Sequence, residues 1–233
     1  MTFSYQPGHP VLRDFTLSVP FGKKVALVGA TGSGKTTVTN LLMRFYDPDS
    51  GEILVGGQVL RTIARDSLRK EIAIVLQDTI LFSDTIRNNL TYGKPDAGQT
   101  QLDAAVEMSR CDELLRLLPQ GWDTVLTGGG TSISQGQRQL LAIARAFIAD
   151  PRILILDEAT SNVDTRTEKA VQDAMRLVMK DRTSIIIAHR LSTIRDADLI
   201  VVMDQGRIVK CSPSQGHFSL THRAEACPRD THL

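Results

Sequence analysis

The feature that most constrains the fold is a glycine-rich segment between a short apolar run and a helical stretch. Residues 24–28 read Lys-Val-Ala-Leu-Val, and residues 29–36 read Gly-Ala-Thr-Gly-Ser-Gly-Lys-Thr. A continuous apolar run of this length predicts a buried strand, and residues 36–46 are expected to form the helix that follows it. The glycines allow the chain to turn tightly between the two. This order predicts a strand–loop–helix unit of an α/β protein.

The rest of the chain repeats the alternation of apolar runs and helical stretches. Further strands are expected at 71–76, 153–156, 184–188 and 199–203, and strong helices at 137–148 and 165–179. Strands that are apolar throughout suit a parallel sheet covered on both faces. The alternation therefore predicts a doubly wound α/β core with a mostly parallel sheet.

Two regions depart from this alternation. Residues from about 85 to 148 are mainly helical, with loop signals at 93–96 and 118–121, and we interpret them as a helical lobe inserted into the core. Residues 211–233 have no useful apolar period, which predicts a poorly ordered tail. The expected organisation is thus one domain over residues 1–210, followed by an atypical tail.

Composition limits the classes of function. Of 233 residues, 42% are hydrophobic and 23% are charged, as in ordinary globular proteins. The formal net charge of +1 offers no electrostatic reason for nucleic acid as a partner. Three sparse cysteines favour a reducing compartment. The longest apolar runs have about five residues, far below the ~20 that cross a bilayer. Any membrane role must come from another chain or a missing segment.

Residues 29–36 match the P-loop pattern G-x-x-x-x-G-K-[ST], in the strand-to-helix context that this pattern requires. Backbone N–H groups and the helix N-terminus favour phosphate at such a turn. We expect Lys35 to reach the β and γ phosphates of a nucleotide, and the Thr36 hydroxyl to coordinate Mg²⁺. The alternative is a glycine-rich turn without a ligand. The expected phosphate-binding set is Gly29, Ala30, Thr31, Gly32, Ser33, Gly34, Lys35, Thr36 and Thr37.

An apolar strand at 153–156 ends in two carboxylates, Asp157 and Glu158. Acids at the carboxyl end of a core strand lie beside the phosphate site in this architecture. Asp157 is expected to hold Mg²⁺ through its water shell, and Glu158 to orient or deprotonate the attacking water. The alternative is a pair of acids at a helix N-terminus, stabilised by the helix dipole.

Residues 131–139, Thr-Ser-Ile-Ser-Gln-Gly-Gln-Arg-Gln, lie just upstream of the two carboxylates. They resemble the signature Leu-Ser-Gly-Gly-Gln of the ABC family, with Ile133 in place of leucine and Gln135 in place of the first glycine. Ser134 is expected to cap the following helix, which makes a second anion site. In the family this site, here Ser134, Gly136 and Gln137, meets the nucleotide that is held by the opposite subunit. An ordinary capped helix is the alternative.

Other positions resemble family motifs across residues 1 to about 210. Tyr5 resembles the aromatic that stacks on adenine, or is an edge-strand tyrosine. Gln77 resembles the glutamine that links the lobes to Mg²⁺ and water, or is an exposed loop residue. Asp164 resembles the aspartate of the dimer-interface loop and can also cap a helix. His189 resembles the switch histidine that contacts the γ-phosphate, or is structural.

The resemblance implies a P-loop NTPase core with a mostly parallel sheet, an N-terminal antiparallel β subdomain and an inserted helical lobe. It implies ATP and Mg²⁺ as cofactors, catalysis by Lys35, Gln77, Glu158 and His189, and metal contacts by Thr36, Gln77 and Asp157. It also implies that two such domains, as a homodimer or a heterodimer, enclose two ATP molecules head to tail.

Residues 79–90 resemble exporter-type domains, in which this surface receives a short helix of the membrane domain. Leu81 and Phe82 are apolar residues in an expected loop, which suits a docking groove, although a satellite core cluster is the alternative. Because the sequence starts almost at its first strand, we expect a detached C-terminal domain or a separate subunit. It would act at the cytoplasmic face of a membrane, through a transmembrane partner.

Two other functions remain as alternatives. One is a soluble ABC ATPase of DNA repair or translation, which usually carries coiled-coil insertions or basic arms. The other is a slow regulatory half of a heterodimer. Gln135 in place of the first signature glycine is consistent with this alternative. The tail departs from the family after Lys210, which suggests a shifted reading frame, and Cys211, His217, His222 and Cys227 match no usual zinc spacing.

Overall fold

The computed structural model describes residues 1–76, 78–157, 165–188 and 191–213. The chain divides into two compact units, one formed by Met1–Ile72 with Thr183–Leu233 and the other by Ala73–Arg182. Six strands form a mostly parallel sheet. The first unit contributes β10, β9, β3 and β8 to it in that spatial order, and the second contributes β7 and β6. The predicted α/β class is confirmed.

The centre of the first unit is strand β3 (Lys24–Val28). It pairs in parallel with β8 (Thr183–Ile187) on one side and with β9 (Leu199–Asp204) on the other. Val25, Ala26 and Leu27 are fully buried, so both faces of the strand are covered, as its continuous apolar sequence predicts. Strand β10 (Arg207–Pro213) closes this side of the sheet in antiparallel pairing with β9.

Two short antiparallel ribbons complete the sheet elements of the first unit. Strands β1 (Phe3–Gln6) and β2 (His9–Leu12) form one ribbon, and β4 (Leu54–Val55) and β5 (Gln58–Val59) form the other. Phe3 and Leu12 of the first ribbon join the core cluster that contains Leu27 of β3 and Leu41 of helix α1 (Lys35–Leu42). The predicted N-terminal antiparallel β subdomain is therefore confirmed, and its core is shared with the helix that follows β3.

The first unit also holds three short helical elements at its surface. They are η1 (Leu60–Thr62), α2 (Arg65–Glu71) and α8 (Leu191–Arg195).

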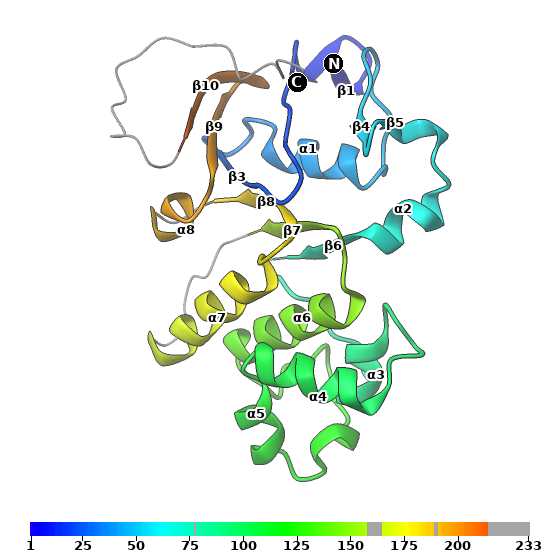
Figure 1. Cartoon of the computed structure of the whole chain (residues 1–233), viewed down its shortest axis with the longest axis vertical. Coiled ribbons are helices and arrows are strands. Elements are labelled where there is room, and N and C mark those ends of the chain that lie inside the picture. Colours follow the sequence, from blue (N-terminus) through cyan, green and yellow to red (C-terminus); the bar gives the residue numbers. More distant parts are fainter. Residues whose placement is uncertain (77, 158–164, 189–190, 214–233) are drawn as a thin grey trace. The chain divides into compact units, whose positions relative to one another are not determined.

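The second unit is mainly helical and is arranged around α6 (Gln135–Ala149). Helix α6 contacts three other helices, α3 (Ile86–Thr91), α4 (Gln99–Met108) and α7 (Thr165–Val178) (Figure 1). The remaining elements are α5 (Asp112–Leu117), η2 (Gly121–Asp123), β7 (Ile153–Asp157) and β6 (Ile72–Val75), whose first residue belongs to the other unit. The predicted helical stretch of about 85–148 lies within this unit.

Helix α6 is buried on most of its surface because its sequence is apolar on most sides. Leu141, Ile143 and Ala144 have no exposed surface, and the helix ends at Asp150, which takes a left-handed conformation with φ of 48°. A helix that is apolar nearly all round belongs in a protein core. This burial makes α6 the element on which the rest of the unit packs.

Two element boundaries differ from the prediction by three residues or more. The helix after the glycine-rich loop ends at Leu42 and not at Tyr46, because Arg44 adopts a φ of 54° and terminates the helix. Strand β10 extends to Pro213, so Cys211–Pro213 of the expected tail pair with Val201–Leu199. Residues 214–233 lie outside the described residues.

Within the described ranges, no helix combines the length and the apolarity that crossing a bilayer requires.

Candidate functional site

The glycine-rich loop folds as a cradle that leaves no room for side chains at two of its glycines. A Cβ atom on Gly29 would lie 2.2 Å from the carbonyl oxygen of Met203, and one on Gly34 would lie 2.7 Å from a methyl group of Leu12. Gly34 also has a φ of 100°, which L-residues rarely adopt. Only glycine at both positions permits this close approach of the backbone, so the loop requires the residues that the sequence provides.

Helix α1 starts directly at this cradle. Its N-cap residue, Gly34, provides no side-chain cap for the first N–H groups. Uncapped N–H groups at a helix N-terminus favour an anion, since both the hydrogen bonds and the dipole act in the same direction. Gly34 therefore leaves the start of α1 suited to phosphate.

The carbonyl oxygens of the loop hold the side chain of its one charged residue, Lys35. The Lys35 ammonium group donates to the carbonyl oxygens of Gly29, at 2.7 Å, and of Ala30, at 2.9 Å, and the side chain is 7% exposed. The nearby Ser33 hydroxyl is buried without a hydrogen-bond partner. Buried polar groups normally have partners, and an orphaned one inside a cradle fits a site that a polar ligand completes. The residues present thus fit the triphosphate that the sequence predicts.

Tyr5 lies beside this cradle in the same unit. Its hydroxyl donates to Thr37 Oγ1 on α1 at 3.3 Å, and the residue is 45% exposed. Thr37 is buried, whereas Thr36 is exposed at the first turn. The structure therefore brings together Tyr5 and the predicted set of residues 29–37, and leaves the Thr36 hydroxyl open to solvent where a Mg²⁺ ligand is expected.

The second predicted anion site lies at the N-terminus of α6. The Gln137 N–H donates to Ser134 Oγ at 3.2 Å, and the Ser134 N–H donates to Gln137 Oε1 at 2.9 Å, which forms a reciprocal capping box. Ile133 is buried, which explains why an apolar residue is needed there, and Gly136 is buried in the first turn. The predicted cap at Ser134 is present.

A polar cavity of about 250 Å³ lies next to this helix start. Gln135, which occupies a position where the family usually has glycine, forms part of its wall. Arg138 is held there by hydrogen bonds from its guanidinium to the carbonyl oxygens of Gly130 and Ile133, at 3.2 and 2.8 Å. The lining residues are Asp78, Thr79, Gly129, Thr131, Gln135 and Arg138.

Besides Thr36, the structure describes one further residue predicted for metal binding, Asp157. It is the last residue of β7 and is half-buried, as expected for an acid at the carboxyl end of a core strand. Gln77, Glu158, Asp164 and His189 lie outside the described residues. Their roles stay predictions from the sequence.

The segment after position 77 contains an exposed aromatic pair that the sequence only partly indicates. Leu81 is 3% exposed and belongs to the interior, whereas Phe82 is 39% exposed and stacks on Tyr92, with ring centroids 4.5 Å apart. Ile80 and Tyr92 are 67% and 64% exposed. Of the two apolar residues predicted for a docking groove, only Phe82 is at the surface. The sequence signal for Tyr92 is its place directly after α3, a helix that starts four residues after Phe82.

Asn89 and Arg145, which were not singled out in the sequence, hold this segment in place. Asn89 is 1% exposed, and its amide pairs with both main-chain groups of Phe82: it accepts from the N–H at 2.8 Å and donates to the carbonyl at 3.0 Å. Arg145 of α6 donates to the Asn89 carbonyl at 2.9 Å and to Ile80 O at 3.3 Å. Burial lowers the pKa of the Arg145 guanidinium from its usual value. The side chains of Asn89 and Arg145 thus provide hydrogen bonds to the main chain of this loop, as a neighbouring strand does in a sheet.

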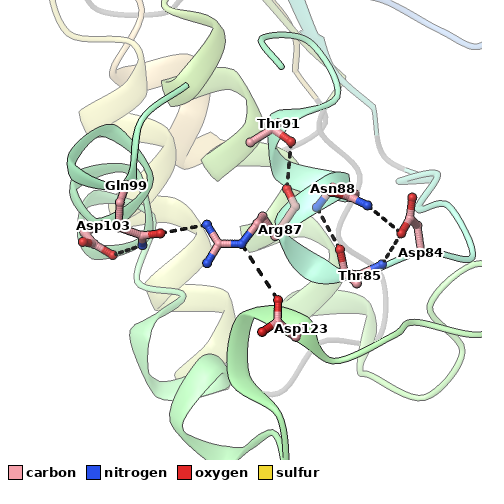
Figure 2. A network of polar contacts seen from close by, with 8 residues as sticks. All are labelled: Asp84, Thr85, Arg87, Asn88, Thr91, Gln99, Asp103 and Asp123. Atoms are coloured by element: carbon pink, nitrogen blue, oxygen red, sulfur yellow. Dashed lines mark hydrogen bonds and ion pairs between the residues drawn. The ribbon is translucent and has the colours of Figure 1, made fainter. Parts of the chain in front are cut away.

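Figure 2 shows how α3, which follows the loop, is fixed at its start and on one side. Thr85 Oγ1 accepts from the Asn88 N–H, and Asp84 Oδ1 accepts from Thr85 N–H and from the Asn88 amide. Arg87 donates to Gln99 of α4 at 2.7 Å and lies 3.9 Å from a carboxylate oxygen of Asp123. The contacts of Arg87 fix the position of α3 relative to α4 and η2.

Taken together, the glycine cradle at α1, the ordered lysine and the aromatic residue beside them define a P-loop nucleotide-binding domain. The model of the ABC transporter family matches residues 12–161. The chain belongs to this family, so the resemblance seen at residues 131–139 is confirmed.

Similar proteins support this assignment. The chain is 51% identical over 210 residues to YfiC, an uncharacterised ABC transporter ATP-binding protein of Bacillus subtilis. The alignment covers 90% of this chain and 35% of YfiC. It is 53% identical to a fatty acid ABC transporter ATP-binding/permease protein of Mycobacterium bovis, over 90% of this chain and 33% of that protein. The chain thus spans about a third of the length of these relatives.

A solved structure shows the same fold. It is the ATP-bound structure of a bacterial Atm1-family ABC exporter, with a TM-score of 0.84 and 43% sequence identity, covering 91% of this chain and 37% of that chain. The mostly parallel sheet, the separate antiparallel strands and the helices of this chain match the nucleotide-binding domain of such an exporter.

Proposed function

We propose that this chain is the ATP-hydrolysing domain of an ABC exporter and that it drives transport through a membrane domain not present in this sequence. The observation that carries the proposal is the glycine cradle of α1, with Lys35 already ordered and Ser33 without a partner. The membrane role is supported by relatives described as ATP-binding/permease proteins and as lipid A-core flippases. The fold likeness to an exporter points in the same direction.

In the proposed reaction, the chain's own residues bind and orient the triphosphate. Lys35 turns from the carbonyl oxygens of its loop to the β and γ phosphates, and the N–H groups at the start of α1 hold the phosphate oxygens. Glu158 orients the attacking water and accepts its proton, and Gln77 and His189 complete the γ-phosphate site. Mg²⁺, when bound, neutralises phosphate charge; Thr36, Gln77 and Asp157 would hold it.

The capped start of α6 is proposed to complete the site of a second copy. Ser134 and Gly136 of one domain would face the triphosphate held by Lys35 of its partner. The Ser134 cap takes up the Gln137 N–H, and the other N–H groups of the first turn and the helix dipole favour an anion. Asp164 would lie at the interface. Each site then needs two chains, and closure of the pair excludes water and moves the attached membrane helices.

The proposed contact with the membrane domain is the exposed apolar surface formed by Ile80, Phe82 and Tyr92. Three large apolar side chains near one loop, two of them stacked, are more than scattered surface residues. The buried bonds of Asn89 and Arg145 give this loop a fixed shape. Such a contact would place the chain at the cytoplasmic face of a membrane.

The proposal is tested by the steady-state rate of phosphate release from MgATP. The wild-type chain should hydrolyse ATP, and Glu158→Gln should reduce the rate at least about a hundredfold, because general-base catalysis is worth about 10²–10⁴. Glu107→Gln, an identical change at an exposed position of α4, should leave the rate unchanged. Equal rates for the wild type and Glu158→Gln would refute the assignment as an ATPase.

A further inference from the structure

The hydroxyl group of Tyr5 is held between two side chains of α1. It donates to Thr37 Oγ1 at 3.3 Å and accepts a hydrogen bond from the Asn40 amide at 3.1 Å. Tyr5 belongs to β1, which is 32 residues from Thr37 in the sequence. Both contacts therefore fix one end of the Tyr5 side chain on the helix that carries the glycine cradle.

Two other aromatic rings fix the orientation of the Tyr5 ring. The ring centroid of Phe3 lies 4.9 Å away with an interplanar angle of 83°, and that of Tyr46 lies 5.0 Å away with an angle of 87°. Near-perpendicular contacts at these distances are favoured by the ring quadrupoles. Phe3 is buried in the core, while Tyr46 comes from the turn after α1 and is 47% exposed. Tyr5 is thus held at its hydroxyl and at its ring, and nearly half of it stays open.

The position of this open ring suits the base of a nucleotide. Thr37 follows Lys35 by two residues in the first turn of α1, where the proposed function places the phosphates. A base joined to those phosphates through a ribose stays within reach of an aromatic ring beside the same turn. Stacking of a base on an aromatic side chain adds to the affinity for a nucleotide when the ring is available. The gain in affinity is larger when the ring is already oriented, because binding then costs less side-chain entropy.

We propose that Asn40 and Tyr46 are positioning residues for the nucleotide base, which act through Tyr5. The inference rests on the proposed function, namely that the cradle of α1 binds a nucleoside triphosphate. Asn40 holds the hydroxyl and Tyr46 holds the ring, so that Tyr5 loses little conformational freedom when the base stacks on it. Neither residue touches the phosphates; they affect only the part of the binding free energy that the base provides.

The test compares two probes by isothermal titration calorimetry, MgATP and magnesium tripolyphosphate, which lacks the base. Asn40→Ala and Tyr46→Leu should each weaken ATP binding about threefold to tenfold, the value of one hydrogen bond or ring contact, and leave tripolyphosphate binding unchanged. Tyr46→Phe keeps the ring contact and should bind ATP as the wild type does. Gln58→Ala, which removes an exposed amide on β5, serves as the matched control.

A double-mutant cycle tests the path through Tyr5. Tyr5→Phe keeps the ring but removes the hydroxyl, so Asn40→Ala should have no further effect on ATP binding in that background. Equal weakening of ATP and tripolyphosphate, or full additivity of Asn40→Ala and Tyr5→Phe, would overturn the inference. So would unchanged ATP affinity in Asn40→Ala and Tyr46→Leu, while the proposed function would stand. A wild-type chain that binds neither probe would instead refute the proposed function itself.

Discussion

Cys111 is a fully buried thiol in the second unit, between α4 and α5. Burial raises its pKa to about 12, a hydrogen bond with Ser109 acts in the opposite direction, and the charge of Asp112 adds to the increase. The thiol is therefore neutral at physiological pH. Since the thiolate is the reactive form, Cys111 has a packing role in the folded chain.

The raised pKa of Cys111 predicts a loss of stability at alkaline pH. The folded state keeps the thiol proton up to about pH 12, whereas the unfolded chain releases it near pH 9.0, so this contribution is fully present below 9.0 and is lost as the pH rises to 12. Between pH 8.5 and 10.5 the wild type should lose about 2 kcal/mol of unfolding free energy more than Cys111→Ala. Urea unfolding of both proteins at the two pH values measures this difference.

Only the difference between wild type and variant is diagnostic, because it cancels the effects of pH that the two proteins share. Parallel stability curves would contradict the raised pKa of Cys111.

At the scale of elements, α6 connects the proposed second anion site to the exposed loop. Its N-terminus carries the Ser134 capping box, and Arg145, about three turns later, reaches the loop that bears Phe82. One rigid helix thus fixes both the signature segment and the aromatic pair. Its burial against α3, α4 and α7 holds this arrangement.

Arg145→Lys should weaken the contact between α6 and the loop. A lysine keeps the charge but cannot reach the carbonyl oxygens of Asn89 and Ile80 together, because it lacks the planar fork of arginine. The unfolding free energy should fall by about 1–3 kcal/mol, the range for hydrogen bonds of a charged group. Chemical unfolding followed by the fluorescence of Trp122, the one tryptophan of the chain, reports on this unit.

The matched control for this prediction is Arg116→Lys on α5, where the guanidinium forms an exposed ion pair with Asp112. Exposed pairs contribute little, so the control should change stability by less than about 0.5 kcal/mol. Equal effects of the two substitutions would show that the buried contacts of Arg145 do not matter for stability.

At the scale of the whole molecule, the proposed site is incomplete in one chain. Lys35 lies in the first unit and Ser134 in the second, and the shared-site proposal has each contribute to a different nucleotide. The rate of ATP hydrolysis per chain should therefore rise with protein concentration in the dilute range, until the chains are mostly paired. Phosphate release measured over a dilution series tests this; a rate per chain that is constant throughout would contradict the shared site.

The sequence predicted the fold class because its patterns are local. The apolar run at 24–28 became β3, and the runs at 153–156, 184–188 and 199–203 became β7, β8 and β9 within one residue at each end. Buried parallel strands are apolar throughout, so their pattern is visible without knowledge of their partners. The turn of the glycine-rich loop from β3 into α1 was likewise predicted, because glycines, lysine and threonine at fixed spacing form a local pattern.

Only the tertiary structure determined which side chains surround these motifs. Asn40 and Tyr46 reach Tyr5 only because β1 packs on α1, and Asn89 meets Arg145, 56 residues later, only because α3 packs on α6. Leu81 and Phe82 are neighbours with equal apolar character, yet one is buried and the other exposed. Contacts between residues far apart in the sequence leave no periodic pattern, so the sequence by itself determined the elements and the phosphate loop, whereas packing decided the surroundings of the site.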